Sequence, residues 1–341
     1  MFSLKNIVRK NILNLKGYSS ARDEYSGVAN VFLDANENPF GELNRYPDPQ
    51  QKELKESLGN LKKINTENIF IGNGSDEVID LAFRIFCNPG EDKALTFSPT
   101  YGMYDVSADI NNIDLVKIPL TDNFQINLKE VTPYLSDKNL KIIFICSPNN
   151  PTGNTIKTSD IENILNNFNG IVIIDEAYID FSSAESWNTK IEQYPNLIVS
   201  QTFSKAWGLA AARVGVAYTN KNIISLFNKI KPPYNVSSLN QKAAINSLNN
   251  FELFEKNKNL ILQEKKLLSE TLKKLDIVKK VYPSDANFIL IEVSNADYIY
   301  NKLVSKKIII RNRNKVIDNC LRITIGSPEE NKQLINELKK S

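Results

Sequence analysis

A repeated unit occupies the chain from about residue 67 to residue 220: a short apolar run, a loop of Gly, Pro, Asn or Ser, and then a helical stretch. The apolar runs do not alternate with polar residues, which is typical of parallel strands that helices cover on both faces. We expect such strands at 68–71, 93–96, 141–146, 170–174, 196–201 and 213–218. The pattern therefore predicts an α/β sheet domain.

A second, smaller unit is expected to follow. A charged helix over about 251–275 has one apolar stripe and one solvated face. After it come strands expected at 287–292, 308–311 and 320–325, with helices at about 296–306 and 328–340. A chain of 341 residues, at roughly 150 residues per domain, also suggests about two domains. We therefore expect an N-terminal arm at 1–40 that joins the small domain, a large domain at 41–245 and a small α+β domain at 246–341.

Composition excludes several kinds of function. His is absent, so neither a histidine general base nor a histidine zinc motif is available. The 42 Lys and Arg residues are interspersed with 39 Asp and Glu residues, which predicts no nucleic-acid surface. No run approaches the ~18 apolar residues that a membrane span needs. Cys87, Cys146 and Cys320 are far apart and lack CxxC spacing, so we expect reduced thiols in a cytoplasmic protein and no metal site.

The first 18 residues are basic and amphipathic but contain no continuous apolar segment of the secretory kind. A docked helical arm is the preferred interpretation, and an organelle transit peptide is the alternative.

Ligands of open α/β sheets bind beyond the carboxyl ends of the strands, so the residues that follow each strand are candidates. The segment 72–77, GNGSDE, follows the first strand and opens a helix, whose free N–H groups would attract a phosphate. A simple turn with an N-cap is the alternative. The segment 148–153, PNNPTG, is a rigid turn that would hold an Asn amide at the sheet edge, or an ordinary turn.

Charged residues follow two further strands. Asp175 ends a very apolar strand, and a lone buried carboxylate costs several kcal/mol unless a cation or hydrogen-bond donors meet it. A structural salt bridge is the alternative for this acid. Lys205 follows the strand at 196–201 and precedes Arg213; it is either a solvated surface lysine or an amine held near a cofactor. Along the chain, a candidate phosphate loop is followed by an Asn turn, then by a buried acid, and then by a lysine with an arginine after it. Together, in this order, these features describe a pyridoxal phosphate site.

The chain resembles the fold-type I pyridoxal-phosphate-dependent aminotransferases and, within that family, the histidinol-phosphate branch. The matching segments lie between about residues 18 and 326: LDANENPFG, RYPDP, GNGSDE, FSPTYGMY, SPNNPTG, IDEAYIDF, TFSKAWGLAAARVG, SDANFIL and LRITIG. The resemblance implies a large domain with a mostly parallel seven-stranded sheet between helices, and a smaller α+β domain. It also implies pyridoxal 5'-phosphate as cofactor and a cytoplasmic homodimer with shared active sites.

The implied reaction transfers an amino group between L-histidinol phosphate and 2-oxoglutarate, giving imidazole acetol phosphate and glutamate, in histidine biosynthesis. An aromatic amino acid aminotransferase and a threonine-phosphate decarboxylase are alternatives that share the cofactor site. A regulator that senses pyridoxal phosphate is a further alternative, but it would need an additional DNA-binding segment. Because the resemblance starts near residue 18, we expect no room for one. A non-enzymatic binding module would have no need for Asp175, Tyr178, Lys205 and Arg213 together.

The resemblance implies catalytic roles for three residues. Lys205 would form the Schiff base with the cofactor and move the proton between substrate and cofactor carbons. Asp175 would keep the pyridine nitrogen protonated, and Tyr178 would hydrogen-bond the 3' oxygen together with Asn150. Tyr101 would stack on the ring. The further cofactor contacts would be Gly74, Ser75, Asp76, Thr202, Ser204, Arg213 and, from the other subunit, Tyr46.

At the substrate end, the resemblance implies that Arg322 receives the carboxylate of an amino donor or the phosphate of histidinol phosphate. Tyr18, Asn36 and Glu37 lie in segments that line the substrate pocket of the family. One departure is Trp207, where many members have Phe; it affects the packing behind Lys205 more than the chemistry.

Overall fold

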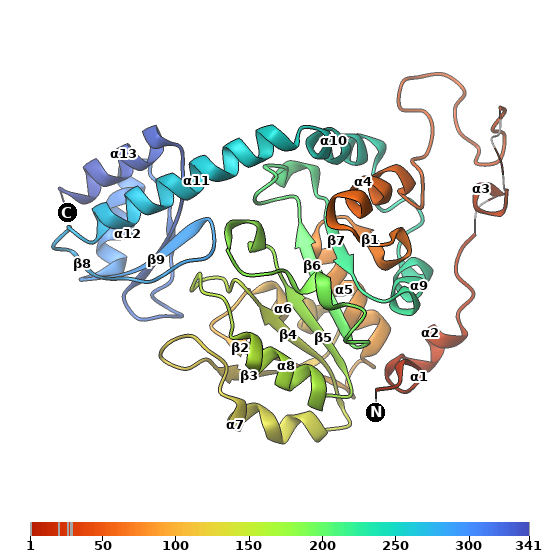
Figure 1. Cartoon of the computed structure of the whole chain (residues 1–341), viewed down its shortest axis with the longest axis horizontal. Helices are drawn as coiled ribbons and strands as arrows, with labels where there is room; N and C mark the ends of the chain where they lie inside the picture. The colour runs from red at the N-terminus through yellow and green to blue at the C-terminus, as the bar shows by residue number, and fades with distance from the viewer. Residues whose placement is uncertain (1, 20, 26, 28–29, 341) are drawn as a thin grey trace.

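The computed structural model describes residues 2–19, 21–25, 27 and 30–340. Its larger sheet has seven strands in the order β1-β7-β6-β5-β4-β2-β3 (Figure 1). The strands are β1 (Ile69–Gly72), β2 (Lys93–Ser98), β3 (Asp114–Pro119), β4 (Leu140–Cys146), β5 (Ile171–Asp175), β6 (Leu197–Thr202) and β7 (Gly215–Tyr218). β7 pairs antiparallel with both β1 and β6, and the other strand pairs of this sheet are parallel. The predicted α/β fold with a mostly parallel seven-stranded sheet is confirmed.

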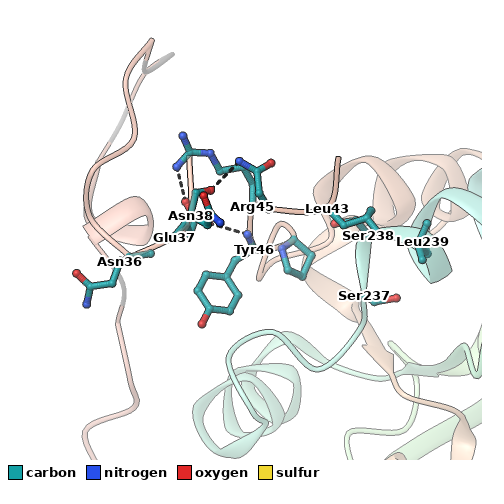
Figure 2. Close-up of a pocket in the computed structure, with 12 residues that line it drawn as sticks. Asn36, Glu37, Asn38, Leu43, Arg45, Tyr46, Ser237, Ser238 and Leu239 are labelled. Carbon is teal, nitrogen blue, oxygen red and sulfur yellow. Dashed lines mark hydrogen bonds and ion pairs between the residues drawn. The ribbon is translucent and has the colours of Figure 1, made fainter. Parts of the chain in front are cut away.

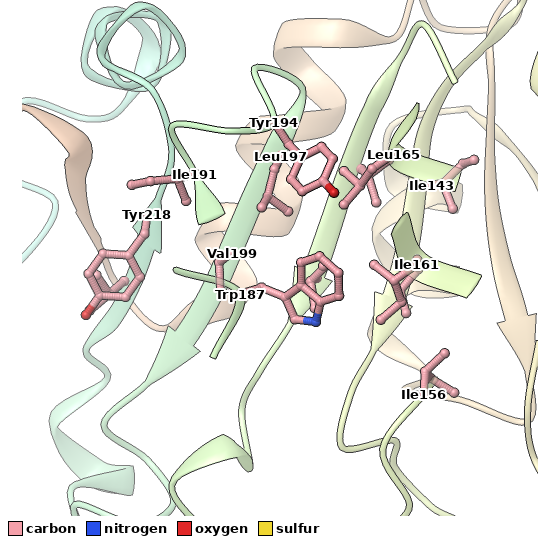
Figure 3. Packing of buried hydrophobic residues seen from close by; sticks show 14 of the residues in the cluster. Ile143, Ile156, Ile161, Leu165, Trp187, Ile191, Tyr194, Leu197, Val199 and Tyr218 are labelled. Atoms are coloured by element: carbon pink, nitrogen blue, oxygen red, sulfur yellow. The ribbon is translucent and has the colours of Figure 1, made fainter. Parts of the chain in front are cut away.

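Apolar side chains cover both faces of this sheet because successive strand residues point to opposite sides. On β5, Val172 and Ile174 belong to one buried cluster, and Ile171 and Ile173 to another. Figure 3 shows part of the first cluster, in which Trp187 packs with side chains of β6 and α8. Each strand therefore contributes to two apolar layers, which is why its sequence is a continuous apolar run.

Helices cover these two faces. In the large domain they are α4 (Lys52–Lys62), α5 (Ser75–Phe86), α6 (Met103–Ile110), α7 (Leu128–Val131), α8 (Thr158–Asn167), α9 (Lys221–Ile230) and α10 (Ser238–Asn249). Among the described residues, no helix is both long enough and apolar enough to cross a membrane.

The smaller unit is an antiparallel sheet in the order β10-β11-β9-β8. Its elements are α11 (Phe251–Leu272), β8 (Val278–Val281), β9 (Phe288–Val293), α12 (Ala296–Ser305), β10 (Arg311–Asn312), β11 (Cys320–Thr324) and α13 (Pro328–Leu338). A separate apolar cluster joins β9 and β11 to α12 and α13. The long helix α11 connects this unit to the large domain (Figure 1).

Two edge strands were not predicted, β3 and β8. Their residues are largely exposed or half-buried, and polar residues interrupt the apolar ones in both. A continuous apolar run marks a strand that is buried on both faces, so this pattern does not reveal edge strands such as β3 and β8.

The N-terminal arm lies on the large domain. It begins with α1 (Leu4–Ile7) and α2 (Lys10–Asn14), followed by α3 (Ala21–Glu24). Val8 and Ile12 join the apolar cluster of α5 and α9, and the N–H of Arg9 donates to the carbonyl of Ile85 at 3.0 Å. The expected association of the arm with the small domain is therefore not what the structure has, because the arm buries its apolar stripe against these two helices on the other side of the molecule (Figure 1).

Candidate active site

A cavity of about 120 Å³ lies at the carboxyl ends of the central strands. Its lining comprises Ser75, Asp76, Tyr101, Cys146, Asn150, Asp175, Ala177, Tyr178, Thr202, Ser204, Lys205, Ala210 and Arg213. The structure thus brings together, within one chain, every residue expected to contact the cofactor except Gly74 and Tyr46. Cys146, which pairs with Asp175 across β4 and β5, Ala177, which precedes Tyr178, and Ala210 also line the cavity, and none of these three was predicted.

Tight packing joins the start of α5 to β7 at one end of the cavity. A Cβ atom on Gly74, whose φ is +82°, would lie 2.6 Å from the guanidinium Nη2 of Arg213. A Cβ atom on Gly215 would lie 2.2 Å from the backbone nitrogen of Ser75. Glycine suits position 74 because its φ is left-handed, and position 215 because a side chain there would push against the backbone at the start of α5.

Hydrogen-bond donors gather at this end of the cavity. Arg213 pairs with Asp76 (Nη2 to Oδ2, 3.3 Å) and donates to the Oγ of Ser204 at 3.4 Å. The Thr202 and Ser204 hydroxyl oxygens are 3.1 Å apart. Together with the free N–H groups of the first turn of α5, these groups can hold a phosphate.

Asp175 lies at the end of β5 and is 4% exposed. Its Oδ1 accepts from the N–H of Ala177 at 3.1 Å, and its Oδ2 accepts from the hydroxyl of Tyr104 at 2.8 Å. Burial raises the pKa of Asp175, and the two hydrogen bonds oppose that rise. A buried carboxylate that faces the cavity is suited to a cationic ring nitrogen. Tyr104 belongs to the FSPTYGMY segment, but its contact with Asp175 was not predicted.

Lys205 lines the cavity beyond β6, and its Nζ lies 5.8 Å from the ring centroid of Tyr178. Partial burial of the amine and the nearby Arg322 lower the pKa of Lys205, while Asp175 opposes them. An amine with a lowered pKa is more often neutral, so it can act as a nucleophile and carry a proton.

Asn150, Tyr178 and Arg322 form a chain of contacts that leads to the small domain. The Nδ2 of Asn150 donates to the Tyr178 hydroxyl at 3.4 Å, and Arg322 donates from Nη1 to the Oδ1 of Asn150. Burial lowers the pKa of Arg322, and its Nε is buried with no hydrogen-bond partner among the described residues. An unpaired guanidinium N–H beside the cavity is a ready donor for an anionic substrate group.

The N-terminal candidates lie outside this cavity. Tyr46 is half-exposed, and its ring stacks on Tyr234 with centroids 4.3 Å apart. With Asn36 and Glu37 it borders a different hollow (Figure 2). Tyr18 is 71% exposed. The structure therefore does not bring these four residues to the cofactor cavity of their own chain.

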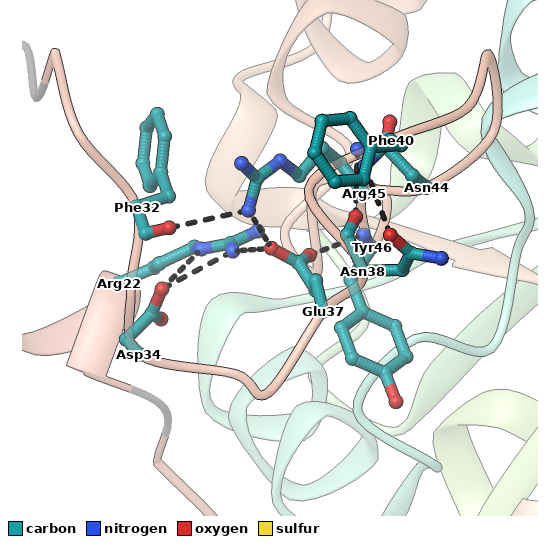
Figure 4. A network of polar contacts seen from close by, with 9 residues as sticks. All are labelled: Arg22, Phe32, Asp34, Glu37, Asn38, Phe40, Asn44, Arg45 and Tyr46. Atoms are coloured by element: carbon teal, nitrogen blue, oxygen red, sulfur yellow. Dashed lines mark hydrogen bonds and ion pairs between the residues drawn. The ribbon is translucent and has the colours of Figure 1, made fainter.

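Glu37 has a structural environment that was not predicted (Figure 4). Its carboxylate accepts from Arg22 at 2.5 Å, from Arg45 at 2.8 Å and from the backbone N–H of Tyr46 at 2.6 Å. The hydrogen bond from Arg22 is the main cause that lowers the pKa of Glu37 to about 2. Glu37 thus joins Arg22 of the arm to the adjacent residues Arg45 and Tyr46, which follow the arm.

Trp207, two residues after Lys205, packs against Phe203, with ring centroids 5.5 Å apart. Its indole stacks on Phe254 of α11, with centroids 3.8 Å apart and planes 16° from parallel. Among the described residues, no group of three His, Cys, Asp or Glu side chains could hold a metal ion.

Comparison with known proteins defines the class. The family model for aminotransferase class I and II matches residues 11–338. The chain belongs to this family of pyridoxal-phosphate-dependent aminotransferases, and it is an enzyme.

The chain is similar over its whole length to particular members. It is 49% identical to the histidinol-phosphate aminotransferase of Cytophaga hutchinsonii over 345 residues, with 99% of each chain covered. It is 51% identical to that of Parabacteroides distasonis over 342 residues, again with 99% of each covered. Among solved structures, the histidinol-phosphate aminotransferase from Clostridium acetobutylicum has a TM-score of 0.80 at 28% identity, covering 87% of this chain and 90% of that chain.

Proposed function

We propose that the protein transfers an amino group between L-histidinol phosphate and 2-oxoglutarate, giving imidazole acetol phosphate and glutamate, as a step of histidine biosynthesis. The observation that carries this proposal is the full-length identity of about half with histidinol-phosphate aminotransferases. The cavity supports it, because Lys205, Asp175 and Arg322 supply the amine, the buried anion and the anion receptor that transamination of such substrates needs.

Pyridoxal 5'-phosphate is the cofactor, and the cavity has suitable groups for each part of it. Arg213, the Thr202 and Ser204 hydroxyls and the first turn of α5 would hold its phosphate. Tyr101 would lie against the ring, and Asn150 with Tyr178 would bind the 3' oxygen. When bound, the cofactor withdraws electrons from the carbon that carries the amino group.

Two residues then handle protons. Asp175 would hold a proton on the ring nitrogen, because an anion in a buried site favours the cationic form of its neighbour. Lys205 Nζ would attach the cofactor and, once released, move a proton to and from the substrate carbon. Partial burial and the cations Arg322 and Arg213 lower the pKa of that amine, so more of it is neutral and able to accept a proton, while Asp175 opposes this effect.

Arg322 would bind the carboxylate of 2-oxoglutarate and glutamate, and the phosphate of histidinol phosphate. A planar guanidinium presents the same pair of donors to either anion. One arginine can therefore serve a donor without a carboxylate and an acceptor that has one.

We propose that the protein is a homodimer whose active sites are shared. Several apolar side chains of the N-terminal arm are exposed in the single chain, among them Leu33 at 90% and Phe40 at 81%. Clustered exposed apolar groups mark an interaction surface. Tyr46, Tyr18, Asn36 and Glu37 lie outside the cavity of their own chain, so they would contribute to a cofactor or substrate site only across the interface of a two-fold dimer.

The domain boundaries at residues 40 and 245, and a cytoplasmic location, remain part of this proposal. Cys87, Cys146 and Cys320 are buried and unbridged, which fits a reducing compartment.

The test is turnover of the purified protein with 2-oxoglutarate and one of several donors. Histidinol phosphate should be preferred over phenylalanine and tyrosine by a wide margin. Preference for either aromatic amino acid would assign the protein to the aromatic alternative, and release of carbon dioxide from threonine phosphate without transamination would assign it to the decarboxylases.

A further inference from the structure

Tyr104 of α6 is a fully buried tyrosine that contacts Asp175 and Tyr101, two residues that line the cofactor cavity. Its ring stacks on Phe144 of β4 with centroids 4.8 Å apart, and Tyr101 meets it edge-on at 5.7 Å. These two contacts fix the ring, so its hydroxyl has a defined direction. The hydroxyl donates to the Oδ2 of Asp175 at 2.8 Å.

Tyr104 provides the only side-chain hydrogen bond to Asp175 among the described residues; the other donor is the backbone N–H of Ala177. The titratable side chains that act on Asp175 from the surrounding elements are Asp76, Tyr101, Tyr104, Cys146, Tyr178 and Lys205. Of these, only Lys205 is a cation, and it makes no hydrogen bond to Asp175 in the structure.

We propose that Tyr104 is a positioning residue that acts through Asp175, holding the carboxylate ionised and oriented for the ring nitrogen of the cofactor. The inference rests on the role proposed above for Asp175. A hydrogen bond to the charged form of an acid favours that form. A phenyl ring in place of the phenol would leave Oδ2 buried without a donor, and a buried carboxylate without donors prefers to be protonated.

The direction of the pKa effect agrees with this geometry. Burial raises the pKa of Asp175, and the hydrogen bond from Tyr104 is the largest contribution that lowers it. The hydroxyl therefore extends the ionised range of Asp175 toward lower pH.

The experiment measures the dissociation constant of pyridoxal 5'-phosphate from the full-length protein stripped of cofactor, between about pH 5 and pH 8. Affinity should fall as Asp175 becomes protonated. In Tyr104→Phe the fall should begin about one to two pH units higher, because the variant loses a hydrogen bond that favours the charged form of the carboxyl group. Tyr218→Phe is the matched control, because Tyr218 is also buried but lies away from the cavity; its curve should follow the wild type.

A second substitution separates hydrogen bonding from packing. Replacing Tyr104 by 3-fluorotyrosine keeps the ring and makes the phenol a stronger donor, so the pH at which affinity falls should move down instead of up. A purely structural role would not produce opposite shifts. The same pH dependence in wild type, Tyr104→Phe and the fluorinated protein would overturn the proposal, as would an equal shift in Tyr218→Phe.

Asp175→Asn separates the role proposed for Asp175 from the role proposed for Tyr104. In this variant the affinity for pyridoxal 5'-phosphate should no longer depend on pH in this range. Adding Tyr104→Phe to it should not change that. If Asp175→Asn itself left the pH dependence unchanged, the role proposed for Asp175 would be wrong. If Asp175→Asn removed it while Tyr104→Phe did not shift it, only the role of Tyr104 would be wrong.

Discussion

The guanidinium of Arg322, on β11 of the small domain, donates a hydrogen bond to the Oδ1 of Asn150, which follows β4 of the large domain. Asn150 also donates to the Tyr178 hydroxyl. The proposed substrate-binding arginine thus contacts Asn150, one of the two residues proposed to bind the cofactor's 3' oxygen. The position of the small domain therefore decides where an anionic substrate group can bind.

Arg322→Gln should weaken both half-reactions. We expect KM for histidinol phosphate and for 2-oxoglutarate to rise by about 100-fold, because two charge-assisted hydrogen bonds are lost and each ~1.4 kcal/mol is tenfold in affinity. Steady-state kinetics with each substrate varied in turn measures the effect. Arg84→Gln, which removes a surface arginine of α5, is the control and should behave as wild type. An effect on only one substrate would show that the two anions use different receptors.

Lys205→Ala should abolish transamination, with a loss of at least about 10⁴-fold, because the covalent attachment and the proton carrier are both removed. Cofactor binding should be weakened only in part, since Arg213 and the start of α5 still hold the phosphate. Turnover assays and cofactor retention after dialysis measure the two quantities. Lys265→Ala is a matched control: Lys265 is also partly buried with a lowered pKa, but it donates to backbone carbonyls of 284 and 286. Near-normal turnover of Lys205→Ala would show that Lys205 is not the residue that attaches the cofactor and carries the proton.

Glu176 should make the stability of the protein depend on pH. Its buried carboxyl accepts from Ser186, Trp187 and Gln201, yet burial raises its pKa from 4.5 to about 7. Unfolding releases this proton between those two pH values, so the free energy of unfolding falls as pH rises through this window.

Glu176→Gln should remove that dependence. Relative to this variant, the wild type should lose up to about 3 kcal/mol of stability as pH rises from about 4.5 to about 7. Denaturant unfolding at a series of pH values is the measurement, and Glu192→Gln, at an exposed position nearby, should follow the wild type. Parallel curves for wild type and Glu176→Gln would mean that the carboxylate remains ionised when buried.

Mixed dimers test the proposed location of Tyr46. A Tyr46→Ala chain and a Lys205→Ala chain, each nearly inactive alone, should recover activity when their subunits exchange. One site of the mixed dimer would then combine an intact Lys205 with an intact Tyr46 from the other chain, while the second site carries both defects. Recovery should approach one working site per mixed dimer.

The control pairs the Lys205→Ala chain with an Asp175→Asn chain. Both of these residues line the cavity of one chain, so every site of the mixed dimer stays defective and no recovery is expected. If Tyr46→Ala gave no recovery despite verified exchange, Tyr46 would belong to its own chain's site or to neither.

The sequence alone determined the class of fold, because each central strand is buried on both faces and is therefore an uninterrupted apolar run. It also determined which residues meet at the cavity: Asp175, Asn150 and Lys205 each follow a strand, and the carboxyl ends of parallel strands meet at one edge of a sheet. The order of the motifs was then specific enough to indicate the cofactor. These features are local in the chain, so periodicity and spacing suffice to predict them.

The tertiary structure alone decided the contacts that join distant segments. The edge strands β3 and β8 depend on pairing with a neighbour rather than on an apolar run of their own. The hydroxyl of Tyr104 reaches Asp175 across 71 residues of sequence, and nothing local to either residue predicts that distance. The arm was expected on the small domain but packs on α5 and α9, because an amphipathic helix specifies that it must bury an apolar face without specifying which surface receives it.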